Sequence, residues 1–204
     1  MNMKKIFFGL FLLACILTLN SCEKKTGGCT NQAALNYNAE ANENDGSCIE
    51  IGSDYEGGIL AYILQPDDPG YDANVKHGLI VDTLCHFSLI EWGCSGTSTG
   101  ATSTALGAGR ANTIAIVNGC NESGAAYVCD TLVSGGYDDW FLPSRDELDK
   151  LYKSKDLIGG FASDRYWSSS ESNEHYAWSH DFGNDSIKEN HKYHPYYVRA
   201  VRSF

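Results

Sequence analysis

Residues 140–148 read Trp-Phe-Leu-Pro-Ser-Arg-Asp-Glu-Leu, an apolar strand that passes directly into a helix. Pro143 ends the strand because it has no backbone N–H to donate. Ser144 and Glu147 then predict a capping box, in which the hydroxyl accepts from the backbone N–H three residues on and the carboxylate reaches back. The residues that follow recur at helical spacing and predict one buried stripe, made of Leu148, Leu151 and Tyr152.

From Tyr55 onward the chain consists of short apolar runs divided by Gly and Pro. Runs at 58–64 and 78–81 predict strands on either side of a turn-rich insertion. A long Gly, Ser and Thr loop over 93–109 leads into a helix at 110–118, on which Ile114 and Val117 share one face. After residue 160 the pattern predicts strands and loops, with strands at 166–168, 176–178 and 196–201. Two helices among many short strands indicate an α+β domain.

The first 22 residues have the pattern of a bacterial lipoprotein signal peptide, expected to span residues 1–21. Two lysines precede an apolar run at 6–19 that is short for a membrane span, and the small Ser21 precedes Cys22. Cleavage would leave Cys22 as an acylated N-terminus and residues 22–28 as a flexible lipidated tether. An ordinary secretory signal is the alternative. We expect a lipid-anchored protein of the bacterial outer membrane; whether it faces the periplasm or the cell surface stays open.

Export would place the mature chain in an oxidising compartment, where cysteines persist as disulfides. Cys15 leaves with the signal and Cys22 is acylated, so six cysteines remain. Pairing of neighbours along the chain gives loops of 19, 9 and 9 residues, the least demanding closures. Zinc is the rival, but the chain has no Cys-x-x-Cys spacing. The sequence therefore predicts a disulfide-braced domain with the pairs Cys29–Cys48, Cys85–Cys94 and Cys120–Cys129.

The composition is that of an ordinary folded domain, with 43% hydrophobic and 12% aromatic residues. Without the signal peptide the chain has 13 basic and 26 acidic residues, a formal charge of −13. This charge would repel polyanions, so nucleic acid is not an expected partner. No second apolar run reaches the length of a membrane span, and the lipid is therefore the expected contact with the membrane.

Residues 29–50 form a separate small unit, flanked by cysteines and rich in Asn and turn residues. The unit resembles short cysteine-flanked repeats, with an Asn-Tyr-Asn centre and an Asp-Gly-Ser-Cys end, of cell-surface proteins of gliding-type bacteria; their role is open. Calcium is one hypothesis for a cofactor here, although the EF-hand register fails. The alternative is that the Asn side chains close their own turns. The residues concerned are Asn36, Asn38, Glu40, Asn42 and Asn44.

Three blocks stand in order in the C-terminal half: residues 140–148, then 166–171 (Tyr-Trp-Ser-Ser-Ser-Glu) and 197–202 (Tyr-Val-Arg-Ala-Val-Arg). As a set they resemble the domain-of-unknown-function family typified by the C-terminal domain of the collagen-like bacterial adhesin Lcl, over about residues 55–204. The resemblance implies a C-type-lectin-like α+β domain, in the variant shared with formylglycine-generating enzymes, with twisted antiparallel strands and two helices. It also implies binding of a surface ligand, with glycans the best attested class. The adhesin binds sulfated polysaccharide, which the charge of −13 disfavours here.

Residues 171–197 are dense in aromatic rings and short polar groups. This mixture suits carbohydrate binding, because the C–H faces of sugars lie on rings and their hydroxyls bond to Asn, Asp and Glu. The alternative is an exposed loop with Trp167 and Trp178 in the core. The candidate binding residues are Glu171, Asn173, His175, Tyr176, Trp178, Asp181, Asn190, Tyr193, His194 and Tyr196.

Metal binding is a second hypothesis for the same segment. His191 and His194 could share a zinc ion on a helix, but Pro195 argues against a helix there. Calcium is the other metal considered. Its candidate ligands are Glu171, Glu174, Asp181 and Asp185. Arg199 and Arg202, in the last strand, are expected to face inward and pair with carboxylates.

Three functions from different classes remain. We favour a lectin-like cell-surface or envelope protein that binds an extracellular glycan or protein, as in adhesion. The second is a structural envelope protein that contacts neighbouring proteins. The third is an enzyme, which we do not expect and for which no catalytic residue is assigned. The formylglycine-generating group needs two reactive cysteines late in the fold, and none follows Cys129; a hydrolase using Glu171 and Asp181 stays open. Ligand identity and oligomeric state also stay open.

Overall fold

The structure is a computed structural model that describes residues 24–83, 87–120 and 123–204. The expected signal peptide, the expected lipidation site Cys22 and Cys85 lie outside the described residues. Within the described residues, every helix is too short or too polar to cross a membrane.

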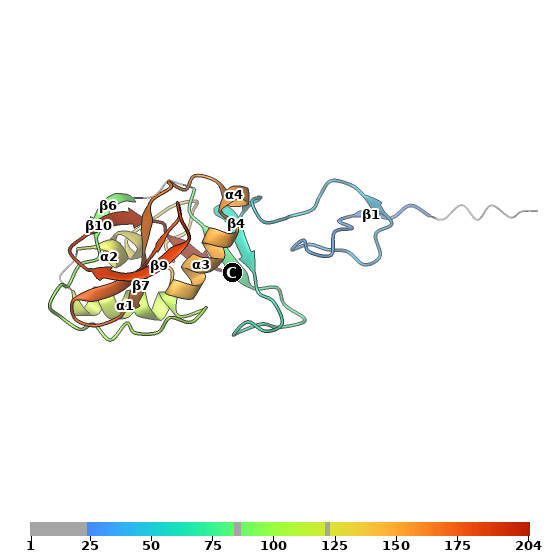
Figure 1. Ribbon diagram of the computed structural model, residues 1–204. Coiled ribbons are helices and arrows are strands. Elements are labelled where there is room, and N and C mark those ends of the chain that lie inside the picture. Colours follow the sequence, from blue (N-terminus) through green and yellow to red (C-terminus); the bar gives the residue numbers. More distant parts are fainter. Residues whose placement is uncertain (1–23, 84–86, 121–122) are drawn as a thin grey trace, which may run out of the picture.

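A five-stranded mixed sheet forms the larger layer of the domain (Figure 1). Its order is β6-β10-β7-β8-β9, and neighbours are antiparallel except for β10 and β7, which run parallel. The strands are β6 (Phe87–Glu91), β7 (Arg165–Glu171), β8 (Tyr176–Asp181), β9 (Ser186–His191) and β10 (Pro195–Val198).

A second sheet has four antiparallel strands in the order β11-β5-β4-β3. The predicted strands at 58–64 and 78–81 are confirmed as β4 and β5, whereas the predicted strand at 196–201 is divided between the two sheets. Its first part is β10 and its last residue begins β11, with Arg199 and Ala200 connecting them. The strands are β3 (Asp54–Tyr55), β4 (Gly58–Ile63), β5 (Gly78–Val81) and β11 (Val201–Ser203).

Four helices accompany the sheets in the described residues, and the α+β class is confirmed. The two predicted helices are α1 and α3, and the short α2 and α4 were not predicted. The capping box of α3 is confirmed: Ser144 Oγ accepts from Glu147 N, and the Glu147 carboxylate accepts from Ser144 N at 2.7 Å. The helices are α1 (Gly109–Gly119), α2 (Ala125–Asp130), α3 (Arg145–Lys153) and α4 (Lys155–Ile158).

Two details of these local predictions are wrong. Residues 140–142 are buried but do not form a regular strand, because only Phe141 pairs, through a single bridge to Val201. On α1, Ile114 is 49% exposed, and Asn112, Thr113 and Ile116 face the core instead. Both polar side chains can be buried because they form hydrogen bonds: Asn112 donates to Ser103 O at 2.7 Å, and the Thr113 hydroxyl accepts from Leu142 N at 3.0 Å.

The core of the five-stranded sheet contains three fully buried tryptophans, Trp92, Trp140 and Trp167. Each indole N–H finds a backbone carbonyl; Trp92, for example, donates to Ser168 O at 2.8 Å. These bonds let the large rings pack without leaving a buried donor unsatisfied. The rings thereby fix β7 against the segment that leads out of β6.

The repeat, residues 29–50, is closed by the predicted Cys29–Cys48 disulfide. Two short parallel strands, β1 (Gly27–Gly28) just before the repeat and β2 (Glu43–Asn44) in its later part, pair with each other. The Asn side chains close turns, as the alternative hypothesis predicted: Asn38 Oδ1 accepts from Glu40 N and Asn44 Oδ1 from Gly46 N, both at 3.0 Å. These oxygens bind the chain's own amides, which weakens the calcium hypothesis for the repeat.

The other two predicted disulfides need correction. Cys94 pairs with Cys120, not with Cys85, and Cys129 is a buried free thiol. The physical reason is helix α2, which turns Cys129 into the core and away from Cys120 at the end of α1. The prediction failed because it paired the cysteines that are nearest in sequence, whereas the fold brings Cys94 next to Cys120.

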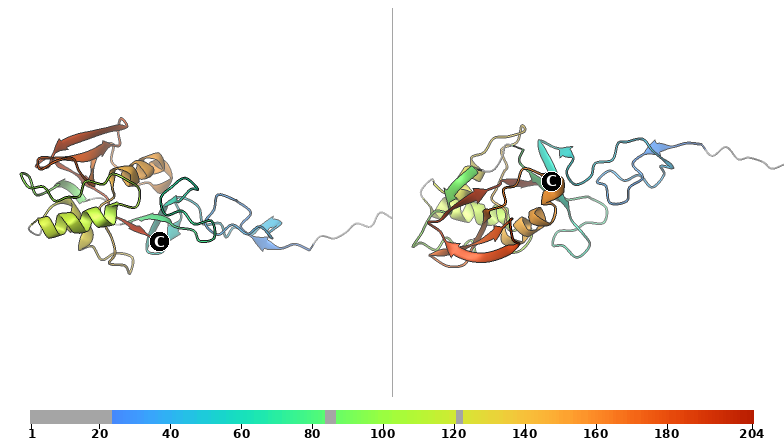
Figure 2. Two further views of the ribbon diagram at one scale, coloured as in Figure 1. Left: turned by 90° about the horizontal axis from the view of Figure 1, so that it is seen from below. Right: turned by 45° about the horizontal axis from the view of Figure 1, so that its top comes forward.

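The described parts follow one another along a line (Figures 1 and 2). The five-stranded sheet with α1 lies at one end, the four-stranded sheet is in the middle, and the repeat projects at the other end. The turn between β9 and β10 therefore lies at the end away from the repeat.

Candidate functional site

Two turns and one loop meet at the far end of the five-stranded sheet. The turn between β7 and β8 (residues 172–175) and the turn between β9 and β10 (residues 192–194) are adjacent, because Tyr176 pairs with His191 and Lys192 N donates to His175 O at 3.0 Å. The loop after Cys94 joins them through a bond from Gly96 N to Glu174 O at 2.9 Å. We call these residues, 172–176 and 191–196 with loop 94–100, the tip.

The tip carries a continuous series of rings, which we call the aromatic ridge. Tyr193 is nearly parallel to His191, with ring centroids 4.8 Å apart. Tyr176 lies 4.0 Å from His191, and His194 lies 4.7 Å from Tyr193. His194 is followed by Tyr196 at 5.8 Å. The ridge consists of Tyr176, His191, Tyr193, His194 and Tyr196.

Contacts below the ridge hold its rings in position. The Tyr176 hydroxyl lies 2.7 Å from His191 Nε2. Tyr196 packs on buried Trp167, with centroids 4.7 Å apart, and donates to Asn190 Oδ1 at 2.9 Å. Rings that are already ordered lose little conformational entropy when a ligand packs on them. Tyr193, at 51% exposed, offers the most open ring of the ridge.

A buried ion pair supports the tip from inside. Lys192 Nζ donates to Glu171 Oε1 at 2.6 Å, and both side chains are fully buried. The same carboxylate accepts from the backbone N–H groups of Thr99 and Gly100 at 3.0 Å. Burial alone would raise the pKa of Glu171, but the bond from Lys192, those amides and the lysine charge outweigh burial and hold the pKa below its ordinary value. Glu171 is therefore a support for loop 94–100 and is not available to an external ligand.

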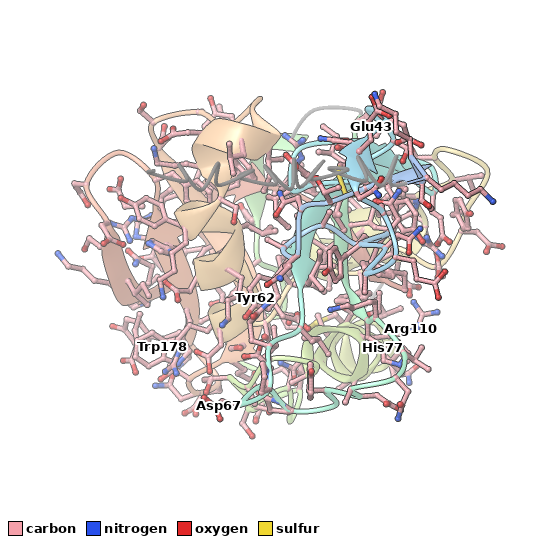
Figure 3. The ribbon with its side chains drawn as sticks, turned by 90° about the vertical axis from the view of Figure 1, so that its right-hand side faces the viewer. Glu43, Tyr62, Asp67, His77, Arg110 and Trp178 are labelled. Carbon is pink, nitrogen blue, oxygen red and sulfur yellow. A yellow bond between two sulfur atoms is a disulfide. The ribbon has the colours of Figure 1, made fainter. Side chains whose placement is uncertain are left out.

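The other predicted binding residues have different surroundings. Asn173 Oδ1 closes the hairpin turn by accepting from His175 N at 2.9 Å, and both residues are exposed. Trp178 is half-buried, with the Arg145 guanidinium 5.2 Å from its ring centroid, and it lies at the lower left of Figure 3, opposite Glu43 of the repeat. Asp181 forms an ion pair with Arg165 at 3.2 Å. Asn190 donates to Ser179 Oγ and accepts from Tyr196.

The candidates are thus divided. Six belong to the tip at its surface, and they are Asn173, His175, Tyr176, Tyr193, His194 and Tyr196. The remaining four, which support the tip or lie along the strands, are Glu171, Trp178, Asp181 and Asn190. The burial predicted for Trp167 is confirmed, and that of Trp178 is partial.

The metal hypotheses gain little from the geometry. In the described part of the chain, no group of three or more His, Cys, Asp or Glu side chains is arranged to hold a metal ion. Two of the four proposed calcium ligands already form ion pairs, Glu171 with Lys192 and Asp181 with Arg165. A third, Asp185, has its Oδ1 2.9 Å from His180 Nε2. The inward pairing of Arg202 is confirmed, because it binds Asp139 at 2.7 Å, and Arg199 is buried and donates to Gly160 O at 3.1 Å.

Sequence reasoning did not identify several residues that build the tip. Lys192 was not considered, because a lysine between His and Tyr in a polar segment gives no sign that it is buried. β6 joins the sheet beside the tip by pairing Glu91 opposite Pro195, about 100 residues away. Loop 94–100 was predicted as a loop, but its bonds to Glu171 and Glu174 depend on tertiary structure.

The chain therefore contains an α+β domain with a series of ordered aromatic rings at one end. The chain belongs to the Lcl C-terminal domain family, whose model matches residues 90–202, more than half of the 204 residues. The family is associated with cell-surface adhesins. The match begins at β6, although β4 and β5 before it share a sheet with β11. A search of curated proteins found no match.

Proposed function

We propose that the protein is a lipid-anchored, lectin-like binding protein of the cell envelope or surface, which recognises an extracellular glycan through the aromatic ridge. The single observation that carries this proposal is the ordered series of five rings at the tip, with Tyr193 exposed. Tyrosine rings supply rigid contact area for the C–H faces of sugars, and exposed Asn173 and His175 supply hydrogen-bonding groups beside them.

The order of the parts is consistent with such a role. A lipid at Cys22 would hold the chain at the membrane, the few residues before β1 would act as a tether, and the disulfide-closed repeat, whose β2 pairs with β1, would act as a spacer. The turn between β9 and β10, which carries Tyr193, lies at the end away from the repeat (Figure 1). A ligand in front of the membrane would then meet the ridge first. Attachment to the outer membrane is part of this proposal.

The experiment is glycan-array binding by the mature chain carrying Cys22→Ala, which removes the expected lipid. Binding should be detected, and Tyr193→Ala should weaken it roughly tenfold, since one aromatic contact is worth about 1 kcal/mol or slightly more. Tyr37→Ala, at an exposed tyrosine of the repeat, is the matched control and should leave binding unchanged. A blank array together with capture of envelope proteins would favour the structural alternative.

A hydrolase is the less supported alternative. Its proposed carboxylates are Glu171, which is buried against Lys192, and Asp181, which is paired with Arg165. A general acid or nucleophile must reach the glycosidic bond, and these contacts leave neither carboxylate open to one. Turnover of a chromogenic glycoside that is lost in Glu171→Gln, while the variant stays folded, would overturn our proposal that the protein is not an enzyme.

A further inference from the structure

Strands β8 and β9 continue the surface of the tip along one face of the five-stranded sheet. Their antiparallel pairing is regular over six consecutive residue pairs, beginning with Tyr176 opposite His191. Residues directly opposite each other project from the same face, and so does every second residue along a strand. Trp178, which is opposite Glu189, therefore shares a face with Tyr176 and His191. We call these four residues, Tyr176, Trp178, Glu189 and His191, the strip.

The two ends of the strip differ. At the tip, the His191 ring contacts both Tyr176 and exposed Tyr193, at centroid distances of 4.0 Å and 4.8 Å, so the strip is continuous with the aromatic ridge. At the other end, helix α3 covers the same face, because Tyr152 packs on buried His180 with ring centroids 4.5 Å apart. The strip is therefore a surface of limited length that ends beside α3.

The Trp178 end of the strip has polar groups on two sides. Trp178 is half-buried, and the Arg145 guanidinium of α3 lies 5.2 Å from its ring centroid. Arg145 forms an ion pair with Asp146 at 2.8 Å, and both side chains are partly exposed. On β9, exposed Glu189 accepts from Ser172 Oγ at 2.8 Å. An aromatic ring with ordered donors and acceptors beside it suits a polyhydroxylated ligand.

The charges along the strip argue for an uncharged ligand. Glu189 and Asp146 are acidic and Arg145 is basic, so neither sign of ligand charge is favoured along the whole strip. The formal charge of −13 opposes a polyanion in addition. Hydroxyl groups both donate and accept hydrogen bonds, and they can therefore bond to all three side chains.

We infer that the ligand is a linear, uncharged glycan whose chain lies along the strip, with one sugar unit on Tyr193 and a later unit on Trp178. This inference rests on the function proposed above and names the class of ligand. Trp178 lies two residues beyond Tyr176, about 7 Å further from the tip along β8. A single sugar on Tyr193 does not reach Trp178, whereas a chain of several units does.

The first test is the dependence of affinity on chain length, measured at pH 8 with the mature chain carrying Cys22→Ala. The probes are cello-oligosaccharides and N-acetylglucosamine oligomers of two, four and six units, which are linear and uncharged. Affinity should rise at least roughly tenfold from dimer to hexamer in the series that binds, or about 1.4 kcal/mol. Equal affinities of dimer and hexamer would overturn the inference.

Variants separate a contact with Trp178 from the statistical gain that a longer chain has through its repeated units. Trp178→Ala should weaken the hexamer roughly tenfold and leave the dimer unchanged, whereas Tyr193→Ala should weaken both. Glu189→Ala, at an exposed position, should also weaken the hexamer alone. Tyr71→Ala, at a half-buried tyrosine between β4 and β5, is the matched control and should change neither. Equal effects of Trp178→Ala on both lengths would contradict the inference.

Tryptophan fluorescence tests the same contact in the chain with no substitution in the domain. Trp92, Trp140 and Trp167 are fully buried, so Trp178 is the tryptophan that acrylamide can reach. The hexamer at saturating concentration should protect Trp178 from quenching, and the dimer should protect it less. Quenching that the bound hexamer leaves unchanged would show that the chain does not lie along the strip.

The outcomes also distinguish this inference from the function on which it rests. Binding of another glycan on the array, lost in Tyr193→Ala but unchanged in Trp178→Ala, would contradict the inference and leave the proposed function standing. Binding of neither oligosaccharide series, combined with a blank array, would contradict both. Unfolding midpoints of each variant, measured in parallel, exclude loss of binding through loss of structure.

Discussion

The Glu171–Lys192 pair shows how one buried contact can organise a surface. Glu171 ends β7, and Lys192 lies in the turn after β9. Their opposite charges neutralise each other, and the Glu171 carboxylate also accepts hydrogen bonds from two backbone amides of loop 94–100. A buried pair adds little net stability compared with apolar residues, but removal of one partner leaves an uncompensated charge. Loss of Lys192 should therefore affect stability far more than the pair itself contributes.

Lys192→Met should lower the free energy of unfolding by about 3 to 5 kcal/mol, and Glu171→Gln in the same chain should recover part of it. Urea unfolding of the mature chain with Cys22→Ala checks both. Lys153→Met is the control, because Lys153 forms an exposed ion pair with Asp149 and its loss should cost less than about 1 kcal/mol. Equal effects of the two lysine variants would contradict the structural role of Lys192.

The same pair predicts a pH dependence. The pKa of Glu171 in the folded state lies below its ordinary value of 4.5. The unfolded chain therefore takes up the proton first as pH falls, and the contribution of the carboxylate is fully present above that value and is lost below it. Unfolding free energies measured from neutral to acidic pH should fall more steeply for the parent than for Glu171→Gln, and parallel curves would argue against the assignment.

Cys129 should be unreactive in the folded protein. Burial raises the pKa of its thiol well above the ordinary value, and repulsion from Asp82 and Asp130 adds to the effect, so little thiolate forms. Alkylation of the native mature chain followed by peptide mapping should find the Cys129 peptide unmodified, and alkylation in denaturant should modify it. Recovery of that peptide in a disulfide would show that the assignment of a free thiol is wrong.

At the scale of elements, the sequence predicted those features that depend on neighbouring residues. The capping box of Ser144 and Glu147 joins residues three apart, and it was predicted correctly. Of the predicted stripe of α3, Leu148 and Leu151 are buried and Tyr152 is half-buried against the same core.

Features that depend on distant residues were missed or wrong. Edge strand β6 pairs with β10, about 100 residues later, and nothing within residues 87–91 signals that partner. The pairing of Cys94 with Cys120 was missed for the same reason, because local closure favoured nearer cysteines. The aromatic composition of the tip was predicted, but its order and the support from Lys192 follow only from tertiary contacts.

The two disulfides should differ in their effect on the domain. Cys94 and Cys120 are separated by 26 positions and close a segment that includes loop 94–100, so replacing both by Ala should lower stability by about 3 kcal/mol in the chain-entropy model. Replacing Cys29 and Cys48 by Ala affects only the repeat and should leave the unfolding midpoint of the domain unchanged. Thermal unfolding followed by tryptophan fluorescence measures this difference, because all four tryptophans lie in the domain.

The repeat should be indifferent to calcium. Its Asn oxygens accept from the chain's own amides, as at Asn36, which accepts from Ile49 N at 2.8 Å. Addition of EGTA to the mature chain should therefore leave amide exchange within residues 29–50 unchanged, and calcium should not increase protection there. Protection that rises with calcium would restore the cation hypothesis for this unit.

For the whole molecule, the repeat and the aromatic ridge lie apart, and we therefore expect the affinity of the ridge for a glycan not to depend on the repeat. The repeat approaches the domain near α4, where Asn31, Glu50 and Leu157 line a common hollow, and not at the tip. A chain beginning at Gly52 should bind a soluble glycan with the affinity of the longer mature chain. The control is the unfolding midpoint of both chains. A weaker affinity at equal stability would show that the repeat takes part in recognition.

The crossing of residues 195–203 from one sheet to the other has a consequence for biogenesis. β10 inserts between β6 and β7, and β11 completes the sheet that β3, β4 and β5 begin. Neither sheet can close until these late residues have left the ribosome. If the chain is exported as we propose, it would therefore stay incompletely folded while it passes through the membrane and would complete both sheets only after release.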